Sequence, residues 1–427
     1  MRTFPAALTL LAASAAHAEN RIDMVRPDAP ELAAYGPHKI GVTTMQFTNP
    51  DQVDVVSAAE TGAVSTYDRI LTIEIWYPAT DSTTLGGTYT TLLRDGLTET
   101  ALTGQAGRDA APDTSQTYPR VIISHGYPGN RHLLSPFGEN LASKGYVVAS
   151  IDHPDSTYDD QTAFGSTLVN RPWDQRFVID SVTALDGDLG QIIDGDTIAI
   201  IGYSMGGYGA LIHAGAGVTQ ASTEYAWGAP LGLLERNLMG SDSHAELEND
   251  AIKAIVAFGP WGNNRGFWDA EGLAGIDKPL MLIAGGVDDV SEYDAIRGIF
   301  DGTVNTTRHL LTFESANHNA GAPMPAPAES YAMSEALGYA PFDHYADAVW
   351  DTVRMNNISQ HFITAYLDLH LKGDSAMAAY FDLIPVAEDG RWSVDAAGNP
   401  TEEHSYWAGF PNRTAAGLRF ETQSKAQ

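Results

Sequence analysis

The stretch of sequence that decides the fold reads Thr-Ile-Ala-Ile-Ile-Gly-Tyr-Ser-Met-Gly-Gly, residues 197–207. Its apolar, β-branched first half predicts a short buried strand, Thr197–Tyr203, and the residues Met205–Ala214 predict a helix directly after it. The turn between them is too sharp for side chains two positions on either side of Ser204, which accounts for Gly202 and Gly206. G-x-S-x-G in this context predicts that the Ser204 hydroxyl stands exposed and strained at the carboxyl edge of a sheet, as a nucleophile.

Strands and helices alternate through most of the 427 residues. Continuously apolar strands separated by amphipathic helices predict an α/β protein with a mostly parallel central sheet and helices on both faces. The expected strands are Lys39–Phe47, Arg69–Tyr77, Arg120–Ser124, Tyr146–Ile151, Thr197–Tyr203, Ile252–Phe258, Leu280–Ala284 and Arg308–Phe313, and the expected helices are 131–144, 174–192, 205–214 and 345–371.

Several segments interrupt this alternation. Residues 80–118 hold few large apolar groups and are predicted to form a loop. Three further segments follow core elements at what should be one edge of the sheet, and they predict lid-like insertions, with ordinary surface elaboration as the alternative: 155–173, 215–250 and 319–344. Residues 19–427 are expected to form a single catalytic domain, onto which the tail 380–427 packs.

Composition limits the partners and the compartment. The formal net charge of −30 repels nucleic acid and anionic lipid, so neither is an expected partner, and it suggests adaptation to salt. The absence of Cys excludes disulfides, a thiol nucleophile and Cys-ligated zinc. Residues 1–18 carry an early Arg, a short apolar run and a final Ala-His-Ala, which predict a signal peptide and a secreted or periplasmic protein. No later segment is apolar for long enough to predict a membrane span.

A nucleophilic serine needs a base, and the base needs an acid that orients it. In this topology the acid and then the histidine follow later strands of the sheet. Asp288 follows the strand Leu280–Ala284 and is the expected acid, with its neighbour Asp289 as the alternative. His318 follows the strand Arg308–Phe313 and is the expected base. The histidines of the final helical region are expected to be structural or solvated, namely His344, His361 and His370.

An oxyanion hole requires two backbone N–H donors. Met205, the residue after the nucleophile, is one expected donor. The other is Tyr127, in the Gly-containing loop His125-Gly126-Tyr127-Pro128-Gly129 that follows the strand Arg120–Ser124. His125 itself is expected to brace this loop. Such a site requires no metal and no organic cofactor.

These motifs resemble α/β-hydrolases of the dienelactone-hydrolase and platelet-activating-factor-acetylhydrolase type. The resemblance rests on Ile75-Trp76-Tyr77-Pro78-Ala79, Ser124-His125-Gly126, Leu141-Ala142-Ser143-Lys144-Gly145-Tyr146, the elbow at Ser204, and Tyr366-Leu367 to Leu371-Lys372-Gly373-Asp374. Dienelactone hydrolases proper use Cys at the elbow, which is absent here. The eukaryotic acetylhydrolase takes its acid from the end of the strand that corresponds to Ile252–Phe258, where this chain has no acid.

A second resemblance is to bacterial cutinase-like polyester hydrolases. It rests on Tyr127, on Ser204-Met205-Gly206-Gly207 and on Pro260-Trp261, and it implies that Trp261 flanks the acyl group of the substrate. This chain lacks the disulfide of those enzymes and is longer.

Together these features predict a secreted serine carboxylic-ester hydrolase with a Ser-His-Asp triad and an acyl-enzyme intermediate, acting on short- to medium-chain esters. The alternatives are a polyester hydrolase, a phospholipid acetylhydrolase and a serine peptidase. The expected partner is a small or polymeric ester.

Overall fold

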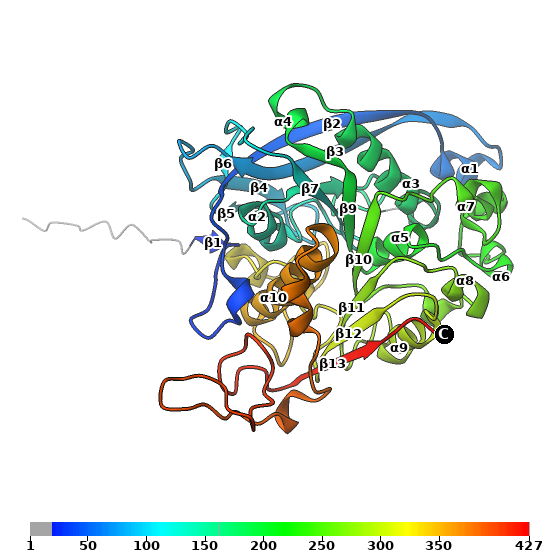
Figure 1. Cartoon of the computed structure of the whole chain (residues 1–427). Coiled ribbons are helices and arrows are strands. Elements are labelled where there is room, and N and C mark those ends of the chain that lie inside the picture. The colour runs from blue at the N-terminus through cyan, green and yellow to red at the C-terminus, as the bar shows by residue number, and fades with distance from the viewer. Residues whose placement is uncertain (1–18, 162, 427) are drawn as a thin grey trace, which may run out of the picture.

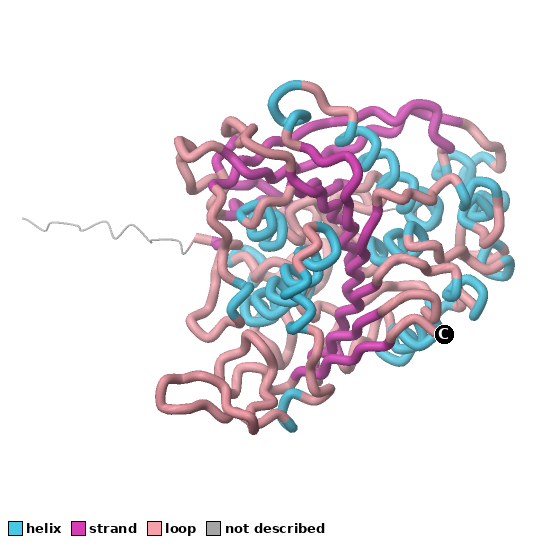
Figure 2. Tube along the Cα trace, in the orientation of Figure 1, coloured by secondary structure: helices cyan, strands magenta, loops and turns pink. Residues whose placement is uncertain are grey.

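The computed structural model describes residues 19–161 and 163–426, so the predicted signal peptide lies outside the described residues. A ten-stranded mixed sheet runs through the molecule in the order β13-β12-β11-β10-β9-β7-β8-β3-β2-β6 (Figures 1 and 2). The six strands from β12 to β8 are parallel, and antiparallel strands flank them on both sides. The strands of this sheet are β2 Lys39–Val53, β3 Thr66–Ala79, β6 Gly107–Arg108, β7 Tyr118–Ser124, β8 Val147–Asp152, β9 Ile193–Tyr203, β10 Ile252–Phe258, β11 Leu280–Gly285, β12 Arg308–Phe313 and β13 Leu418–Gln423.

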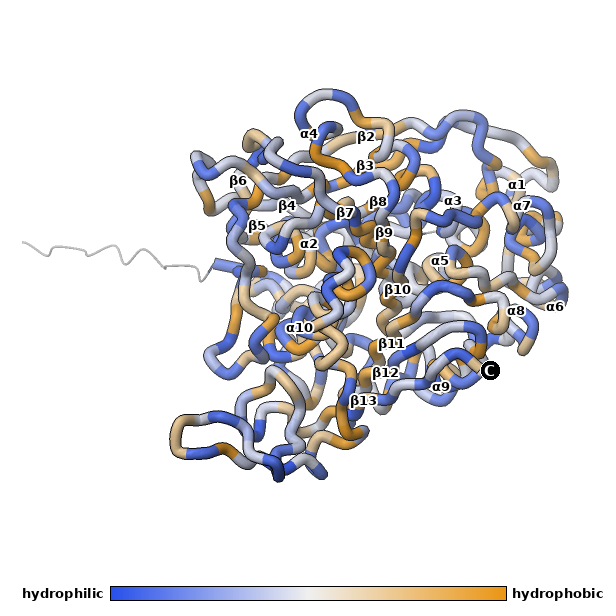
Figure 3. The backbone as a smooth tube through the Cα atoms, viewed as in Figure 1, coloured by the Kyte–Doolittle hydropathy of each residue, from blue (hydrophilic) through white to orange (hydrophobic). Residues whose placement is uncertain are grey.

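Helices cover both faces of this sheet, as expected. Along β7, Val121 and Ile123 belong to one hydrophobic core with α2 and α10, whereas Ile122 between them belongs to the opposite core with α3 and α5. Successive side chains of a strand point to opposite faces, so a strand buried on both faces is apolar at every position. Figure 3 shows this hydrophobic colouring along the central strands. The helices are α1 Val55–Thr61, α2 Ser135–Ser143, α3 Phe164–Thr183, α4 Gly187–Gln191, α5 Met205–His213, α6 Gln220–Thr223, α7 Asp242–Ala245, α8 Ala270–Ala274, α9 Tyr293–Gly302 and α10 Thr352–Leu371.

The expectation that 80–118 forms a loop is wrong. The strands β4 (Thr88–Leu92) and β5 (Glu99–Thr103) pair there, and with β1 (Asn20–Arg21) they form a separate three-stranded sheet. Both strands alternate buried and exposed residues, and Tyr89 and Leu102 are fully buried. Threonine carries much of this two-residue period, so the segment lacks the large apolar groups that mark a strand.

Helix α3 begins at Phe164, well inside the predicted insertion 155–173 and despite Pro172 in its interior. A helical proline leaves the carbonyl four residues earlier without its usual N–H donor. Here that carbonyl, Leu168 O, accepts from Tyr208 Oη at 3.1 Å and from Asn237 Nδ2 at 3.0 Å. Tertiary hydrogen bonds therefore replace the bond that proline removes, and the helix continues.

The C-terminal tail packs on the domain, as expected. Its strand β13 adds to β12 at the edge of the sheet, and Trp407 and Phe410 are buried in the core that contains α10. Within residues 19–161 and 163–426, we find no helix with the length and apolar character that crossing a membrane requires.

Candidate active site

Ser204 stands on a sharp turn between β9 and α5. Its backbone has φ 52° and ψ −112°, so the predicted strain is confirmed. A Cβ atom on Gly202 would lie 2.2 Å from the Gly206 carbonyl oxygen, and one on Gly206 would lie 1.9 Å from the Ser124 carbonyl oxygen. Neither position can hold a side chain, which is the reason expected from the sequence. The Ser204 N–H donates to the Phe258 carbonyl at 2.9 Å, so β10 fixes the turn.

Asp288 and His318 meet beyond the ends of β11 and β12. Asp288 Oδ2 lies 2.8 Å from His318 Nδ1, and Asp288 Oδ1 accepts the backbone N–H groups of Val290 at 2.9 Å and Ser291 at 2.8 Å. Burial alone would raise the pKa of Asp288, but the hydrogen bonds from His318 and from these N–H groups outweigh it, and the pKa lies below its ordinary value. Asp289 is exposed, so the structure brings Asp288, and not its neighbour, to the histidine.

The histidine is held from its other side as well. Its ring packs against the Tyr203 ring with the centroids 5.1 Å apart, and Tyr203 Oη donates to Asn319 Oδ1 at 3.0 Å. Asn319 Nδ2 in turn donates to the carbonyls of Asp343 at 2.9 Å and Ala346 at 2.7 Å. These hydrogen bonds join the start of the predicted insertion 319–344, next to His318, to residues at and just beyond its end.

Ser204 and His318 open into one pocket of about 520 Å³. Several of its lining residues were not predicted from the sequence, including His344, for which a structural or solvated role was expected. His344 lies in a short 3₁₀ turn, and burial lowers its pKa to about 3, so its ring is neutral at physiological pH. No local sequence pattern marks these residues, which lie outside α-helices and strands: Arg94, Asn319, Tyr339, Asp343 and His344.

Tyr127 and Met205 flank the nucleophile. Tyr127 lines the pocket, and a Cβ atom on its neighbour Gly126 would lie only 3.2 Å from Ser204 Cβ. Met205 is the first residue of α5, where N–H groups have no partner inside the helix. Across the described parts of the chain, the backbone N–H groups of Tyr127 and Met205 make no hydrogen bond within the protein. Two free donors therefore stand beside Ser204.

Trp261 lies beside the elbow but lines a second pocket. Its backbone N–H donates to the Ser204 carbonyl at 3.2 Å, while its ring forms part of a pocket of about 340 Å³. Phe164 and Trp227 share this pocket, with ring centroids 5.3 and 6.3 Å from that of Trp261. Phe164 also packs edge-on against Tyr127 at 5.2 Å, so one row of aromatic rings joins the two pockets.

The three predicted insertions supply residues to these two pockets. Phe164 comes from 155–173, Trp227 from 215–250, and Asn319 and His344 from 319–344. Among residues 19–161 and 163–426, no group of three or more His, Asp or Glu side chains is arranged to hold a metal ion.

Comparisons with known proteins agree with this architecture. Residues 104–230 match the family model described as PET hydrolase-like. The ferulic acid esterase of Streptomyces cinnamoneus has a similar structure, with a TM-score of 0.58 and 17% identity over 94% of this chain and 99% of that one. The chain thus has the α/β-hydrolase fold.

The sequence resembles cutinases and platelet-activating factor acetylhydrolases, which confirms the predicted resemblance to each of these two groups. Cutinase est1 of Thermobifida alba is 24% identical over 211 residues, 49% of this chain and 56% of that protein. Cutinase 1 of Thermobifida cellulosilytica is 32% identical over 106 residues, 23% and 36% of the two chains. The acetylhydrolase of Bos taurus is 28% identical over 156 residues, 26% and 35%. The matched segments thus span little more than half of these relatives at most.

Proposed function

We propose that this protein is a serine hydrolase of carboxylic esters. The observation that carries the proposal is one pocket lined by Ser204, His318 and Tyr127, with Asp288 hydrogen-bonded to His318 at 2.8 Å. The names of its relatives support the same activity, because cutinases, an acetylhydrolase and a ferulic acid esterase all act on esters. The N-terminal pattern of residues 1–18 supports action after export.

In the proposed reaction, His318 Nε2 accepts the Ser204 proton while Oγ bonds to the ester carbonyl carbon. The oxygen that becomes negative accepts hydrogen bonds from the N–H groups of Tyr127 and Met205. The bond to the alcohol oxygen then breaks, and His318 returns the proton to the departing alcohol. Water repeats the sequence on the acyl-enzyme and releases the acid, while Asp288 keeps the proton on Nδ1 of His318 throughout.

Hydrolysis of nitrophenyl esters from acetate to palmitate tests the proposal, with wild type and Ser204→Ala compared at equal folded concentration. We expect the variant to lose activity by at least about 10³-fold, and the chain-length profile of the wild type to separate short-acyl from long-acyl preference. Activity retained by Ser204→Ala would refute the serine mechanism. Peptide anilides matched to these esters test the peptidase alternative, for which their faster turnover would be the evidence.

The aromatic row favours a second, narrower candidate, namely esters that carry an aromatic ring or a polymer of such units. Phe164, Trp227 and Trp261 line one pocket and pack against one another at centroid distances of 5.3–6.3 Å. A flat substrate ring suits this pocket, because aromatic rings favour offset or edge-on contact with other aromatic rings. Trp227→Ala removes a half-exposed ring of this row. We expect it to raise KM for ethyl benzoate several-fold and to leave ethyl acetate, which has no ring, unchanged. An equal effect on both esters would contradict this assignment.

A further inference from the structure

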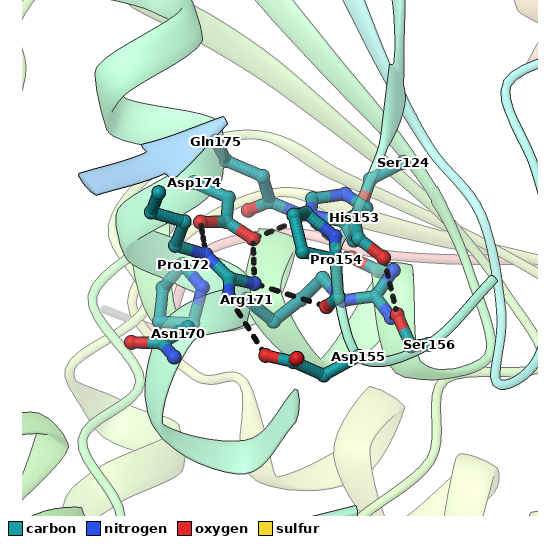
Figure 4. Close-up of polar contacts among 12 residues, drawn as sticks. Ser124, His153, Pro154, Asp155, Ser156, Asn170, Arg171, Pro172, Asp174 and Gln175 are labelled. Carbon is teal, nitrogen blue, oxygen red and sulfur yellow. Dashed lines mark hydrogen bonds and ion pairs between the residues drawn. The ribbon is translucent and has the colours of Figure 1, made fainter. Parts of the chain in front are cut away.

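A second chain of serine, histidine and aspartate lies behind the proposed oxyanion loop (Figure 4). Ser124 Oγ lies 2.8 Å from His153 Nε2, and His153 Nδ1 lies 2.9 Å from Asp174 Oδ2. The three residues come from the end of β7, the segment after β8 and the helix α3. They are 0%, 1% and 2% exposed, so no ester can reach Ser124, and this chain cannot act as a second nucleophile.

An arginine anchors the acid end of this chain. Arg69 Nε and Nη2 donate to the two oxygens of Asp174 at 2.7 and 2.9 Å, and Nη1 pairs with Asp155 at 2.7 Å. Since Asp174 is ionised and can only accept, Nδ1 of His153 carries the ring hydrogen and Nε2 accepts from the Ser124 hydroxyl. Burial and the nearby Arg171 lower the pKa of His153 to about 3 in spite of Asp174, so the ring stays neutral near pH 7.

The same groups hold the loop that carries Tyr127. The backbone N–H of His153 donates to His125 Nε2 at 3.2 Å, and His125 Nδ1 lies 2.7 Å from the Gly126 carbonyl. Arg171 donates to the His125 carbonyl at 2.5 Å. His125 is fully buried, which agrees with the bracing role expected for it. Ser124 and His125 are thereby tied to the segment after β8 and to α3.

We propose that the buried chain Ser124–His153–Asp174 is a positioning device that sets the distance between the Tyr127 N–H and Ser204. The inference rests on the proposed function, because it concerns the oxyanion donor of that site. Ser124 precedes the loop directly, and the loop passes close to the nucleophile, since a Cβ atom added to Gly126 would lie only 3.2 Å from Ser204 Cβ. Hydrogen bonds to a developing charge weaken steeply when the donor is displaced.

Ser124→Ala tests the inference, with Ser143→Ala as the matched control. Both serines are buried and hydrogen-bonded, and Ser143 lies at the end of α2, outside both pockets and the loop. We expect Ser124→Ala to lower kcat at least about tenfold with KM within about twofold, since one oxyanion donor is worth 10²–10³ in kcat. A boronic acid, which forms a tetrahedral adduct on Ser204, should bind more weakly in proportion. Ser143→Ala should lower only Tm.

Unchanged kcat in a folded Ser124→Ala, or an equal loss in Ser143→Ala, overturns the inference. If Ser124→Ala does not fold, Ser124→Cys keeps a weak donor in the same volume and should show a smaller loss of kcat, and full activity in that variant also overturns the inference. Ser204→Ala is assayed in parallel. Activity that survives in Ser204→Ala refutes the proposed function and this inference together, whereas its loss beside an unaffected Ser124→Ala refutes this inference alone.

Discussion

Asp288→Asn should nearly abolish turnover while the protein stays folded, and the reason lies in how the carboxylate is shared. Oδ1 of Asp288 accepts two backbone N–H groups, from Val290 and Ser291, and Oδ2 faces His318 Nδ1. An asparagine in this position must keep its oxygen toward the two backbone donors. Its NH₂ group then faces Nδ1, which has to become an acceptor, so the ring hydrogen moves to Nε2. A histidine protonated on Nε2 cannot accept the Ser204 proton.

The size of the effect follows from this forced tautomer. A base held in the wrong tautomer loses about 10⁴ in kcat in serine hydrolases that have been tested this way, a barrier increase of about 5 kcal/mol. The loss of stability is smaller, because the two backbone hydrogen bonds survive and a neutral bond from the asparagine NH₂ to Nδ1 replaces the charge-assisted one. The exchange of a charge-assisted for a neutral hydrogen bond costs about 1 kcal/mol.

Asp289→Asn is the matched control, because it makes the same chemical change one residue away, at an exposed position on the same pocket, whereas the hydrogen bond to His318 is made by Asp288. We expect its kcat on nitrophenyl acetate to stay within about twofold of wild type, with Tm measured for both variants. A folded Asp288→Asn that keeps more than a tenth of the wild-type kcat would refute the reasoning. So would an equal loss in Asp289→Asn, which would move the role of the acid to Asp289.

Three further predictions concern a glycine, pH and salt. Gly259→Ala should lower kcat at least about tenfold, since its Cβ would lie 3.1 Å from Asp288 Oδ2. The control Gly62→Ala, also at positive φ but with open space around it, should keep its kcat and lose only about 1–2 kcal/mol of stability through backbone strain. Equal kcat values for the two variants would contradict this prediction. Tm should fall as pH drops from 7 to 5, because burial lowers the pKa of four histidines to about 3 in the folded protein, namely His153, His309, His344 and His361. In the unfolded chain these histidines have a pKa near 6.5 and are protonated first, which costs up to about 1.4 kcal/mol of stability per pH unit for each. A Tm that does not change with pH would refute this prediction. Tm should rise with NaCl because salt screens the repulsion of a net charge of −30, and an unchanged Tm up to 1 M would remove the idea of salt adaptation.

The sequence predicted the central sheet well because its strands are buried on both faces. The expected ranges Ile252–Phe258 and Arg308–Phe313 coincide with β10 and β12. Where the signal depended on distant contacts, the prediction was wrong or incomplete. The strands β4 and β5 carry their period on threonines, and the start of α3 depends on side chains of Tyr208 and Asn237 that satisfy the carbonyl facing Pro172.

The same division holds for the candidate site. Ser204, Asp288 and His318 each follow a strand whose carboxyl end lies at the same edge, so strand positions alone place them near one another. His344 and Arg94 reach the pocket from loops whose paths are set by tertiary packing. His153 and Asp174 stand 21 residues apart, on different elements, and no spacing rule relates either of them to Ser124.

The packing around Gly259 fits the proposal that the acid of this chain follows β11. Gly259 directly follows β10, the strand that corresponds to the one from which the acetylhydrolase type takes its acid, and it has φ 44°. A Cβ atom there would lie 3.1 Å from Asp288 Oδ2 and 3.1 Å from His318 Nδ1. The space that an acid from β10 would use is therefore already filled by Asp288. A carboxylate at position 259 would also place two like charges side by side in a buried site, which raises the pKa of one of them and weakens its hold on the histidine. An acid after β11 thus requires a small residue at position 259. We expect an acid introduced at position 259 to orient His318 only in a chain from which the Asp288 carboxylate has been removed.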